Sequence, residues 1–403
     1  MLRRGSALSG HAIICGAGIG GLSAALALHA RGWSVQVIEQ AEELREVGAG
    51  LQLSPNACKV LRALNVLPKL DALSFAPQAL EMRLGRSGRS IFRIALQAPA
   101  AARWNAPYLH LHRADLLQVL TQTLMIRAPG ALRLNARLEQ LKHSASGVEV
   151  KLGCGQRLHG DLLIGADGIH SRVREILFGP DRPRFTGHVA WRAVAPVEAL
   201  GQHRPPPSAC VWTGPQRHAV TYRLRGGALA NFVGVVEQAH WERESWHEQG
   251  PREQVLADFA GWHPIVTRLI ESAAVHHRWA LFDRPPLTSW QHRHCVLLGD
   301  ACHPMLPFMA QGAAMAIEDA WALASSLDAT AQISPALARY ESCRKPRTSR
   351  VQAASRANAK VFHRPAPTYW PLWLLARVWP DFFHRRQDWL YAYDVTDPTS
   401  ENT

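Results

Sequence analysis

The chain has 403 residues, of which 47% are apolar and 19% charged, an ordinary composition for a folded protein with a sizeable core. A surplus of Lys and Arg over Asp and Glu gives a formal net charge of +13, which favours anionic partners. The basic residues are scattered and form no lysine-rich tract, so nucleic-acid binding is not expected. An anionic substrate and a phosphate-bearing cofactor account for the charge.

The first elements are a strand, a helix and a second strand. Residues 11–15 form a short buried-strand run, residues 22–31 have helical apolar spacing, and residues 33–39 have the pattern of another strand. This βαβ unit predicts an α/β fold with a parallel, doubly wound sheet.

A glycine-rich motif joins the first strand to the helix. Gly16, Gly18 and Gly21 match the GxGxxG pattern: the first permits a tight turn, the second lets the backbone approach a pyrophosphate, and the third allows close helix–strand packing. Glu39 ends the second strand, where a carboxylate can accept the hydroxyls of a ribose. The motif therefore predicts dinucleotide binding without specifying which dinucleotide.

Further along, residues 113–124 have the pattern of a helix, and residues 148–152 and 161–165 that of strands in the same domain. Asp167 and Gly168 then form a turn before another helix start. Taken alone, this pair could be only a turn and a cap.

The pattern changes between residues 184 and 278. Alternating runs such as 188–194 and 218–224 predict an antiparallel sheet with one face toward a cavity. Because helical patterns return afterwards, we expect a β-rich domain inserted into a discontinuous cofactor domain.

Residues 296–320 are the most informative segment. A buried strand ending at Asp300 is followed by a proline-containing loop and by a helix that begins at Gly312. The start of such a helix offers free backbone N–H groups and a positive dipole end. The segment therefore suits a cofactor with a ribose and an anionic edge.

The C-terminal part has two features. Residues 342–350 have the pattern of a basic helix end, and the Trp-rich residues 368–393 could be an interfacial membrane anchor or a cap packed on the fold. The prolines and acidic residues of the tail favour the cap.

The seven cysteines are dispersed and form no CxxC pair, which argues for a reducing compartment and against disulfides or a zinc site. Residues 1–10 are too short and polar for a secretory leader, and no apolar run is long enough to span a bilayer. His276 and His277 lack a spaced carboxylate or cysteine companion. We therefore expect a cytoplasmic protein without a metal site.

The glycine loop, the Asp167–Gly168 turn and the Gly299–Asp300 segment, in this order, resemble the three motifs of the class A flavoprotein aromatic hydroxylases, which are single-component FAD monooxygenases. The resemblance runs from about residue 11 to 350. Within the family the chain is most similar to the salicylate, 3-hydroxybenzoate and 6-hydroxynicotinate hydroxylase branch, on the motifs at residues 47–56, 112–116, 260–264 and 315–319.

The resemblance implies an α/β fold with a Rossmann-like FAD-binding domain of the hydroxybenzoate-hydroxylase (GR2) type and an inserted β-rich substrate domain. The expected boundaries are residues 11–75, 108–183 and 279–345 for the FAD domain, 76–107 and 184–278 for the substrate domain, and 346–403 for a helical and aromatic C-terminal cap.

The resemblance also implies positions for FAD. Glu39 would bind the adenosine ribose, Arg113 the pyrophosphate and Asp300 the flavin-side ribitol. The full expected set is Gly16, Gly18, Gly21, Glu39, Gln40, Arg113, Asp167, Asp300, Pro307, Gly312, Ala313 and Ala314. His303 lies beside the flavin loop and is expected to have a structural role.

On the substrate side, His218 and Tyr222 lie four residues apart on one strand face and align with a His and a Tyr implicated in substrate binding and proton transfer in the hydroxynicotinate branch. The alternative is that both are packing residues. Cys210 and Gln52 are expected to line the substrate. Gln52 replaces a His of that branch, and Gln can orient a proton but not accept one. Arg192 or Arg223 is a candidate partner for a substrate carboxylate.

The implied activity uses FAD, NADH or NADPH, and O2, and hydroxylates a small phenolic or hydroxypyridine carboxylate through a flavin C4a-hydroperoxide, with or without decarboxylation. No second dinucleotide motif is present, so the nicotinamide would be held loosely. Two alternatives remain: an FAD epoxidase or hydroxylase of a larger secondary metabolite, and a flavin reductase or binding flavoprotein. The protein is expected to be a monomer or a homodimer.

Overall fold

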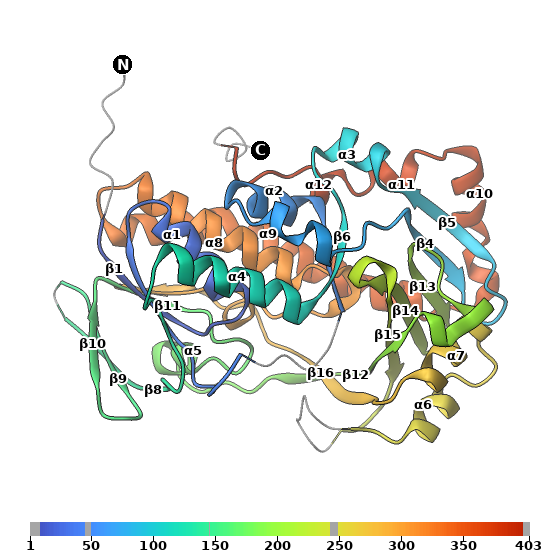
Figure 1. Ribbon diagram of the computed structural model, residues 1–403, viewed down its shortest axis with the longest axis horizontal. Coiled ribbons are helices and arrows are strands. Elements are labelled where there is room, and N and C mark those ends of the chain that lie inside the picture. Colours follow the sequence, from blue (N-terminus) through green and yellow to red (C-terminus); the bar gives the residue numbers. More distant parts are fainter. Residues whose placement is uncertain (1–8, 45–49, 145, 242–248, 398–403) are drawn as a thin grey trace.

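The strands divide mainly between two large sheets, which lie at opposite ends of the molecule (Figure 1). The computed structural model describes residues 9–44, 50–144, 146–241 and 249–397. Two of the sequence predictions fall partly outside these residues. They are the motif at 47–56, of which residues 47–49 are not described, and the N-terminal segment 1–10, of which residues 1–8 are not described. The predicted α/β class with a separate β-rich part is confirmed.

The first sheet has six strands, and β1 in its centre is buried because helix α1 and the strand β10 (Arg157–Gly160) of a separate small sheet both pack against it. All neighbouring pairs are parallel except β17–β18. In sheet order the strands are β17 (Gln291–His292), β18 (Cys295–Leu297), β11 (Leu162–Gly165), β1 (His11–Cys15), β2 (Ser34–Ile38) and β7 (Leu132–Arg133). This arrangement confirms the predicted βαβ start.

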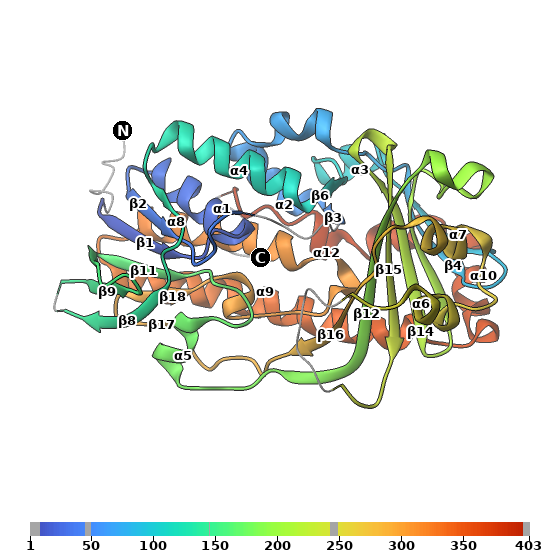
Figure 2. The same cartoon turned by 60° about the horizontal axis from the view of Figure 1, so that its bottom comes forward.

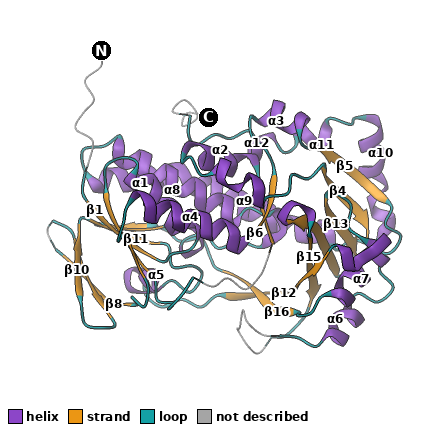
Figure 3. Cartoon of the chain, viewed as in Figure 1, coloured by secondary structure: helices purple, strands orange, loops and turns teal. Residues whose placement is uncertain are grey.

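Helices pack beside this sheet, as Figure 3 shows. Helix α1 contacts both α4 and α8, and its small apolar side chains allow close packing. The helices of this half are α1 (Ile19–His29), α2 (Pro55–Ala63), α4 (Arg113–Arg127), α5 (Arg172–Phe178), α8 (Gly312–Asp328) and α9 (Ile333–Phe362), with the short helices η1 (Leu67–Leu73), η4 (Gly299–Ala301) and η5 (Pro307–Met309).

The second sheet has seven strands and forms the β-rich part. Neighbouring strands are antiparallel except for the parallel pair β13–β4. In sheet order they are β16 (His277–Asp283), β12 (Arg184–Pro196), β15 (Leu229–Glu237), β14 (Arg217–Leu224), β13 (Ala209–Gly214), β4 (Ala79–Leu84) and β5 (Ser90–Ala95).

One face of this sheet is covered by α6 (Arg252–Asp258) and α7 (Pro264–Ser272), which Figure 2 shows beside β14 and β15. Their apolar side chains form a buried cluster with Trp191, Trp212 and Phe232 of the sheet. The opposite face is therefore the one available to a cavity. The remaining elements here are α3 (Ala98–Trp104), η2 (Glu198–His203) and η3 (Arg225–Gly227).

Two small sheets complete the strands. The pair β3 (Gly50–Leu53) and β6 (Leu109–His112) is antiparallel, and β6 contacts β14 of the seven-stranded sheet. A separate antiparallel sheet contains β8 (Leu138–His143), β9 (Val148–Leu152) and β10 (Arg157–Gly160). The strand predicted at 148–152 is thus correct in extent but lies outside the six-stranded sheet.

Several predicted boundaries differ from the structure. The strand expected to end at Asp300 ends at Leu297, because Gly299 adopts a positive φ of 64° and begins η4. The basic residues 342–350 lie in the middle of α9, not at a helix end, since α9 continues past Pro346. The proposed domain limits at 278/279 and 345/346 fall inside β16 and α9, so they do not coincide with element ends.

The C-terminal segment contains η6 (Ala366–Tyr369), α10 (Trp370–Val378), α11 (Phe382–Arg385) and α12 (Asp388–Tyr391). Lys59 Nζ donates to the carbonyls of Tyr391, Ala392 and Tyr393, which fastens this segment to α2. Helix α10 leaves Trp370 65% exposed. No helix in the described part of the chain is long and apolar enough to cross a membrane.

Candidate active site

A cavity of about 750 Å³ lies between the two large sheets. Its walls come from the loops that follow β1 and β18, from β3, from the inner face of the seven-stranded sheet and from the C-terminal segment. This volume is within the range of small-molecule and cofactor sites.

The glycine loop forms one end of the cavity. Gly16 has a φ of 104°, and a Cβ there would lie 2.5 Å from the Ala166 carbonyl oxygen. A Cβ on Gly21 would lie 2.0 Å from the Gly16 carbonyl oxygen, whereas a Cβ on Gly18 would meet open space. Gly16 and Gly21 therefore maintain the tight turn, and Gly18 presents bare backbone to the cavity.

Glu39 and Gln40 follow β2 beside this loop and are not among the cavity-lining residues. The Glu39 carboxylate accepts hydrogen bonds from Ala17 N over 2.9 Å and from Ala41 N over 3.0 Å. Gln40 is exposed. Glu39 thus stabilises the glycine loop and keeps its carboxylate at the edge of the site.

The Asp167–Gly168 turn leads into α5. Asp167 accepts hydrogen bonds from the Ser171 hydroxyl and from Val173 N, so it supports the cap of this helix, whose N-cap residue is Ser171. Burial raises the pKa of Asp167. Gly168, at a φ of 77°, lines the cavity with open space above it, whereas Asp167 does not line it. The cap is therefore the role that the structure shows for Asp167.

Asp300 and Arg113 lie on the cavity wall below the glycine loop. Burial within the protein raises the pKa of Asp300, and the nearby charges of His303 and Arg113 oppose this effect. Arg113 begins α4 and places a positive charge on the same wall. The pair offers a cation for a phosphate and an acceptor for hydroxyl groups.

The start of α8 forms the next part of the wall. Pro307, Gly312 and Ala313 line the cavity, and Ala314 is fully buried behind them. The N-cap residue Gln311 makes no side-chain bond to the helix backbone. The helix start can therefore offer backbone N–H groups and its positive dipole end to an anionic group in the cavity.

A buried polar network holds this helix start from behind. Arg344 donates to Asp319 Oδ1 over 2.7 Å and to Glu318 Oε2 over 2.5 Å. His303 Nε2 lies 2.5 Å from Asp319 Oδ2, and Asn56 donates to Glu318 Oε1 over 2.6 Å. Burial favours a higher pKa for Asp319, but His303 and Arg344 lower it. His303 therefore has a structural contact of the kind expected.

The other half of the cavity is aromatic and basic. His218 and Tyr222 both line it from β14, as does Gln52 from β3. The Tyr108 hydroxyl donates to Gln52 Oε1 over 2.6 Å, which leaves the amide NH2 of Gln52 as its donor for a ligand. Burial raises the pKa of Tyr222, and the nearby charge of Arg192 opposes this effect.

His218 is buried and connects the cavity to His363. Its Nδ1 lies 2.8 Å from Nε2 of His363, and the aromatic rings of Phe308 and Phe362 pack against it. Burial and the neighbouring His363 hold the pKa of His218 well below its ordinary value. Burial therefore favours the neutral ring, whose unprotonated nitrogen can accept a hydrogen bond from a ligand in the cavity.

Two predicted substrate residues are placed elsewhere. Cys210 is fully buried in the cluster beneath α6 and α7, while its neighbours Ala209 and Val211 line the cavity. Arg223 donates to the Pro205 carbonyl and does not line the cavity, whereas Arg192 does. The side chain of Cys210 therefore faces away from the cavity that we expected it to line, because adjacent strand residues face opposite sides.

Sequence reasoning missed lining residues that come mainly from the C-terminal segment. They include Tyr108, Arg364, Arg386 and Tyr391. The C-terminal segment contains no sequence motif that would have predicted them. Tyr108 is the exception, since it directly precedes β6, whose last residue, His112, begins the motif at 112–116.

Comparison with known proteins identifies the family. A family model described as "FAD binding domain" matches residues 10–355. The chain belongs to the class A flavoprotein monooxygenases. Relatives include 3-amino-4-hydroxybenzoate 2-monooxygenase of Streptomyces platensis, 37% identical over 87% of this chain and 88% of the relative. Another is 6-hydroxynicotinate 3-monooxygenase of Bordetella bronchiseptica, 36% identical over 95% of this chain and 94% of the relative.

A solved structure of this class A monooxygenase fold, a Klebsiella pneumoniae protein in complex with FAD and uric acid, is 28% identical with a TM-score of 0.80. It covers 91% of this chain, and the match extends over 94% of that structure. These findings confirm the predicted family, the hydroxylase fold, FAD binding and the assignment as an FAD-dependent aromatic monooxygenase.

The geometry of the cavity fits FAD. Gly18, Gly168 and Gly312 each line it with open space where a side chain would stand. Arg113 and the start of α8 supply positive charge, and Asp300 supplies a hydroxyl acceptor. This wall therefore offers bare backbone, positive charge and a hydroxyl acceptor to a dinucleotide with two phosphates.

Proposed function

We propose that this monooxygenase transfers one oxygen atom from O2 to a small aromatic acid, either a phenolic carboxylate or a hydroxypyridine carboxylate. NADH or NADPH is the reductant. One observation carries the proposal: the same cavity joins the wall that fits FAD to a chamber lined by Arg192, His218, Tyr222 and other aromatic side chains. The relatives that act on aminohydroxybenzoate and hydroxynicotinate support this substrate class.

For the cofactor, we assign the adenosine ribose to Glu39 and the pyrophosphate to Arg113. The remaining proposed FAD positions are Gly16, Gly18, Gly21 and Gln40 near the adenosine, Asp167 and Asp300 near the ribityl chain, and Pro307, Gly312, Ala313 and Ala314 near the flavin ring. Bound FAD, once reduced by the nicotinamide coenzyme, supplies the activation of O2.

The residues of the chain bind and ionise the aromatic substrate. Arg192 is half-buried on the cavity wall, so its charge can pair with a carboxylate that has lost most of its water. His218 accepts the proton of the ring hydroxyl at Nε2, because Nδ1 is engaged with His363. Loss of this proton makes the ring electron-rich, and Tyr222 on the same strand face holds it in place.

The arginines favour an anionic substrate further. Arg192, Arg364 and Arg386 line the chamber, while the lining carboxylate Glu81 accepts from Ser208 over 2.9 Å and pairs with Arg83. The chamber is therefore positive overall, as the formal net charge of the chain suggests. All seven cysteines are free thiols, which is compatible with the proposed cytoplasmic location.

The experiment offers the purified yellow protein NADH or NADPH with a panel of hydroxybenzoates, aminohydroxybenzoates and hydroxypyridine carboxylates. Coenzyme oxidation, hydrogen peroxide and product mass are followed together. The proposal expects one compound to accelerate coenzyme oxidation and to gain the mass of one oxygen atom, with or without loss of CO2. Peroxide without any product across the panel would contradict it and favour a flavin reductase. Turnover of only large apolar compounds would favour an epoxidase.

A further inference from the structure

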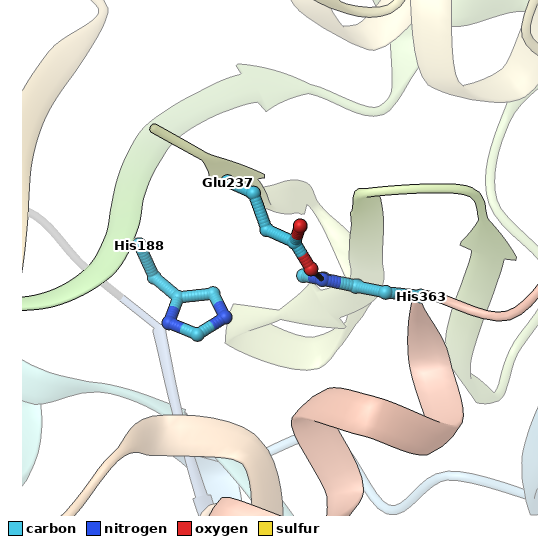
Figure 4. Close-up of side chains that lie close together, drawn as sticks. All are labelled: His188, Glu237 and His363. Carbon is cyan, nitrogen blue, oxygen red and sulfur yellow. Dashed lines mark hydrogen bonds and ion pairs between the residues drawn. The ribbon is translucent and has the colours of Figure 1, made fainter. Parts of the chain in front are cut away.

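Two histidines and a glutamate meet beside the substrate chamber. His188 lies on β12, Glu237 ends β15 and His363 directly follows α9 (Figure 4). One nitrogen of each ring and one carboxylate oxygen lie within 4.8 Å of one another. His363 Nδ1 is 2.7 Å from Glu237 Oε1. These three residues are far apart in the sequence, so no motif with a fixed spacing could have predicted the cluster.

The outer ring nitrogens already have partners. His363 Nε2 lies 2.8 Å from His218 Nδ1, and His188 Nδ1 lies 3.3 Å from Thr186 Oγ1. Metal-binding histidines usually engage the second ring nitrogen in this way, which fixes the ring orientation. The nitrogens left to face the common space are His363 Nδ1 and His188 Nε2, and Figure 4 shows both near the carboxylate of Glu237.

We propose that His188, Glu237 and His363 bind a divalent cation of the Zn²⁺ class. Two imidazoles and one carboxylate are a known ligand set for this ion, with a water completing a tetrahedron. Bond lengths of about 2.0–2.2 Å place such ligand atoms roughly 3.4 Å apart. The hydrogen-bonded His363–Glu237 pair, now 2.7 Å apart, must therefore open slightly, and the wider separations of up to 4.8 Å must shorten. The Glu237 side chain is 44% exposed, which lets it move inward and opens the site to ions from solution.

A metal at this site would control His218, and this consequence rests on the function proposed above. When the cation occupies His363 Nδ1, the proton of that ring must reside on Nε2 and is donated to His218 Nδ1. The neutral His218 ring then carries its own proton on Nε2, the atom proposed to accept the substrate proton. Both rings exchange tautomers without net loss of a proton, and His218 can no longer act as the base.

Binding is tested by calorimetric titration of Zn²⁺ into untagged, FAD-loaded full-length protein after chelator treatment. The variants are His188→Ala and Glu237→Gln. The matched control is His159→Ala, which removes an exposed histidine 3.8 Å from Glu149 on another sheet. We expect one site that weakens by about tenfold or more in each variant and stays unchanged in the control. Equal affinity in all four proteins would overturn the site.

Unchanged FAD content and melting temperature show that a variant is folded. If His188→Ala does not fold, Glu237→Gln alone is used to test the site. The effect on His218 is tested by the ratio of substrate-stimulated rates with and without Zn²⁺. We expect a loss of rate that a chelator reverses and that Glu237→Gln abolishes. Tight binding of Zn²⁺ without any change in the substrate-stimulated rate would show that the metal does not regulate His218. If no aromatic acid is turned over, the function fails, but calorimetry still decides the metal site.

Discussion

Arg344 on α9 and Asp319 on α8 form a fully buried ion pair, in which Nε donates to Oδ1 over 2.7 Å. The other oxygen of Asp319 accepts from Gly299 N over 3.2 Å, one residue before Asp300. The pair therefore connects the long C-terminal helix to the loop that carries a proposed cofactor contact. Glu318 extends the same network to Arg347, which donates to the carbonyls of Trp389 and Leu390.

Replacing Arg344 by Met is expected to destabilise the protein by about 3–5 kcal/mol, because two buried carboxylates, Glu318 and Asp319, lose the cation that they share. Urea unfolding followed by tryptophan fluorescence measures this change, and FAD content reports on the loop. Arg339→Met, on an exposed position of the same helix, is the control. Equal unfolding midpoints for the two variants would contradict a stabilising role of the network.

The three glycines of the loop are expected to respond differently to substitution. Gly18→Ala places a methyl group in open cavity space at an ordinary φ of −74°, so the fold should remain while FAD binds about tenfold or more weakly. Gly21→Ala clashes with the Gly16 carbonyl and should cost about 1–3 kcal/mol or more of stability. Flavin fluorescence and thermal unfolding separate the two effects. Full FAD affinity in Gly18→Ala would place the cofactor elsewhere.

These glycines show what the sequence could predict. The cofactor half was predictable because its signals are local: Gly16–Gly21 follow a strand and precede a helix, and β1 spans the residues expected. The substrate half depends on contacts between distant segments. Tyr391 reaches the cavity because contacts such as those of Lys59 and Arg347 with backbone carbonyls hold the last helix against α2 and α9. Cys210 was misplaced because an offset of one residue on a strand turns a side chain to the other face.

Acid should destabilise the protein partly through His110, which is fully buried. Burial lowers the pKa of His110 to about 3, whereas an unfolded histidine has a pKa of about 6.5. Between these values the unfolded chain binds more protons, so stability falls as the pH falls. From about pH 7 to about pH 4.5 the contribution is about 2–3 kcal/mol.

The His110→Gln variant tests this contribution through urea unfolding at both pH values. The variant is expected to lose less stability on acidification than the parent protein, by the amount given above. Parallel losses in the two proteins would show that His110 is protonated without penalty in the folded state.

Arg192→Met should weaken the binding of an aromatic acid, because the carboxylate loses a cation on the chamber wall. We expect KM to rise about tenfold or more for the acid and to change little for the corresponding carboxamide. Arg223→Met is the matched control, since Arg223 donates to the Pro205 carbonyl outside the cavity. A similar rise of KM in both variants, or for both compounds, would refute a carboxylate contact at Arg192.

The most direct test of the proposed function is mass spectrometry of the aromatic product formed under ¹⁸O2 by the purified FAD protein with its nicotinamide coenzyme. The account predicts that the new hydroxyl group carries one ¹⁸O atom and that His218→Ala forms this product much more slowly while retaining FAD. A product whose new oxygen comes from water, or coenzyme oxidation that yields only labelled hydrogen peroxide with every aromatic acid, would contradict it.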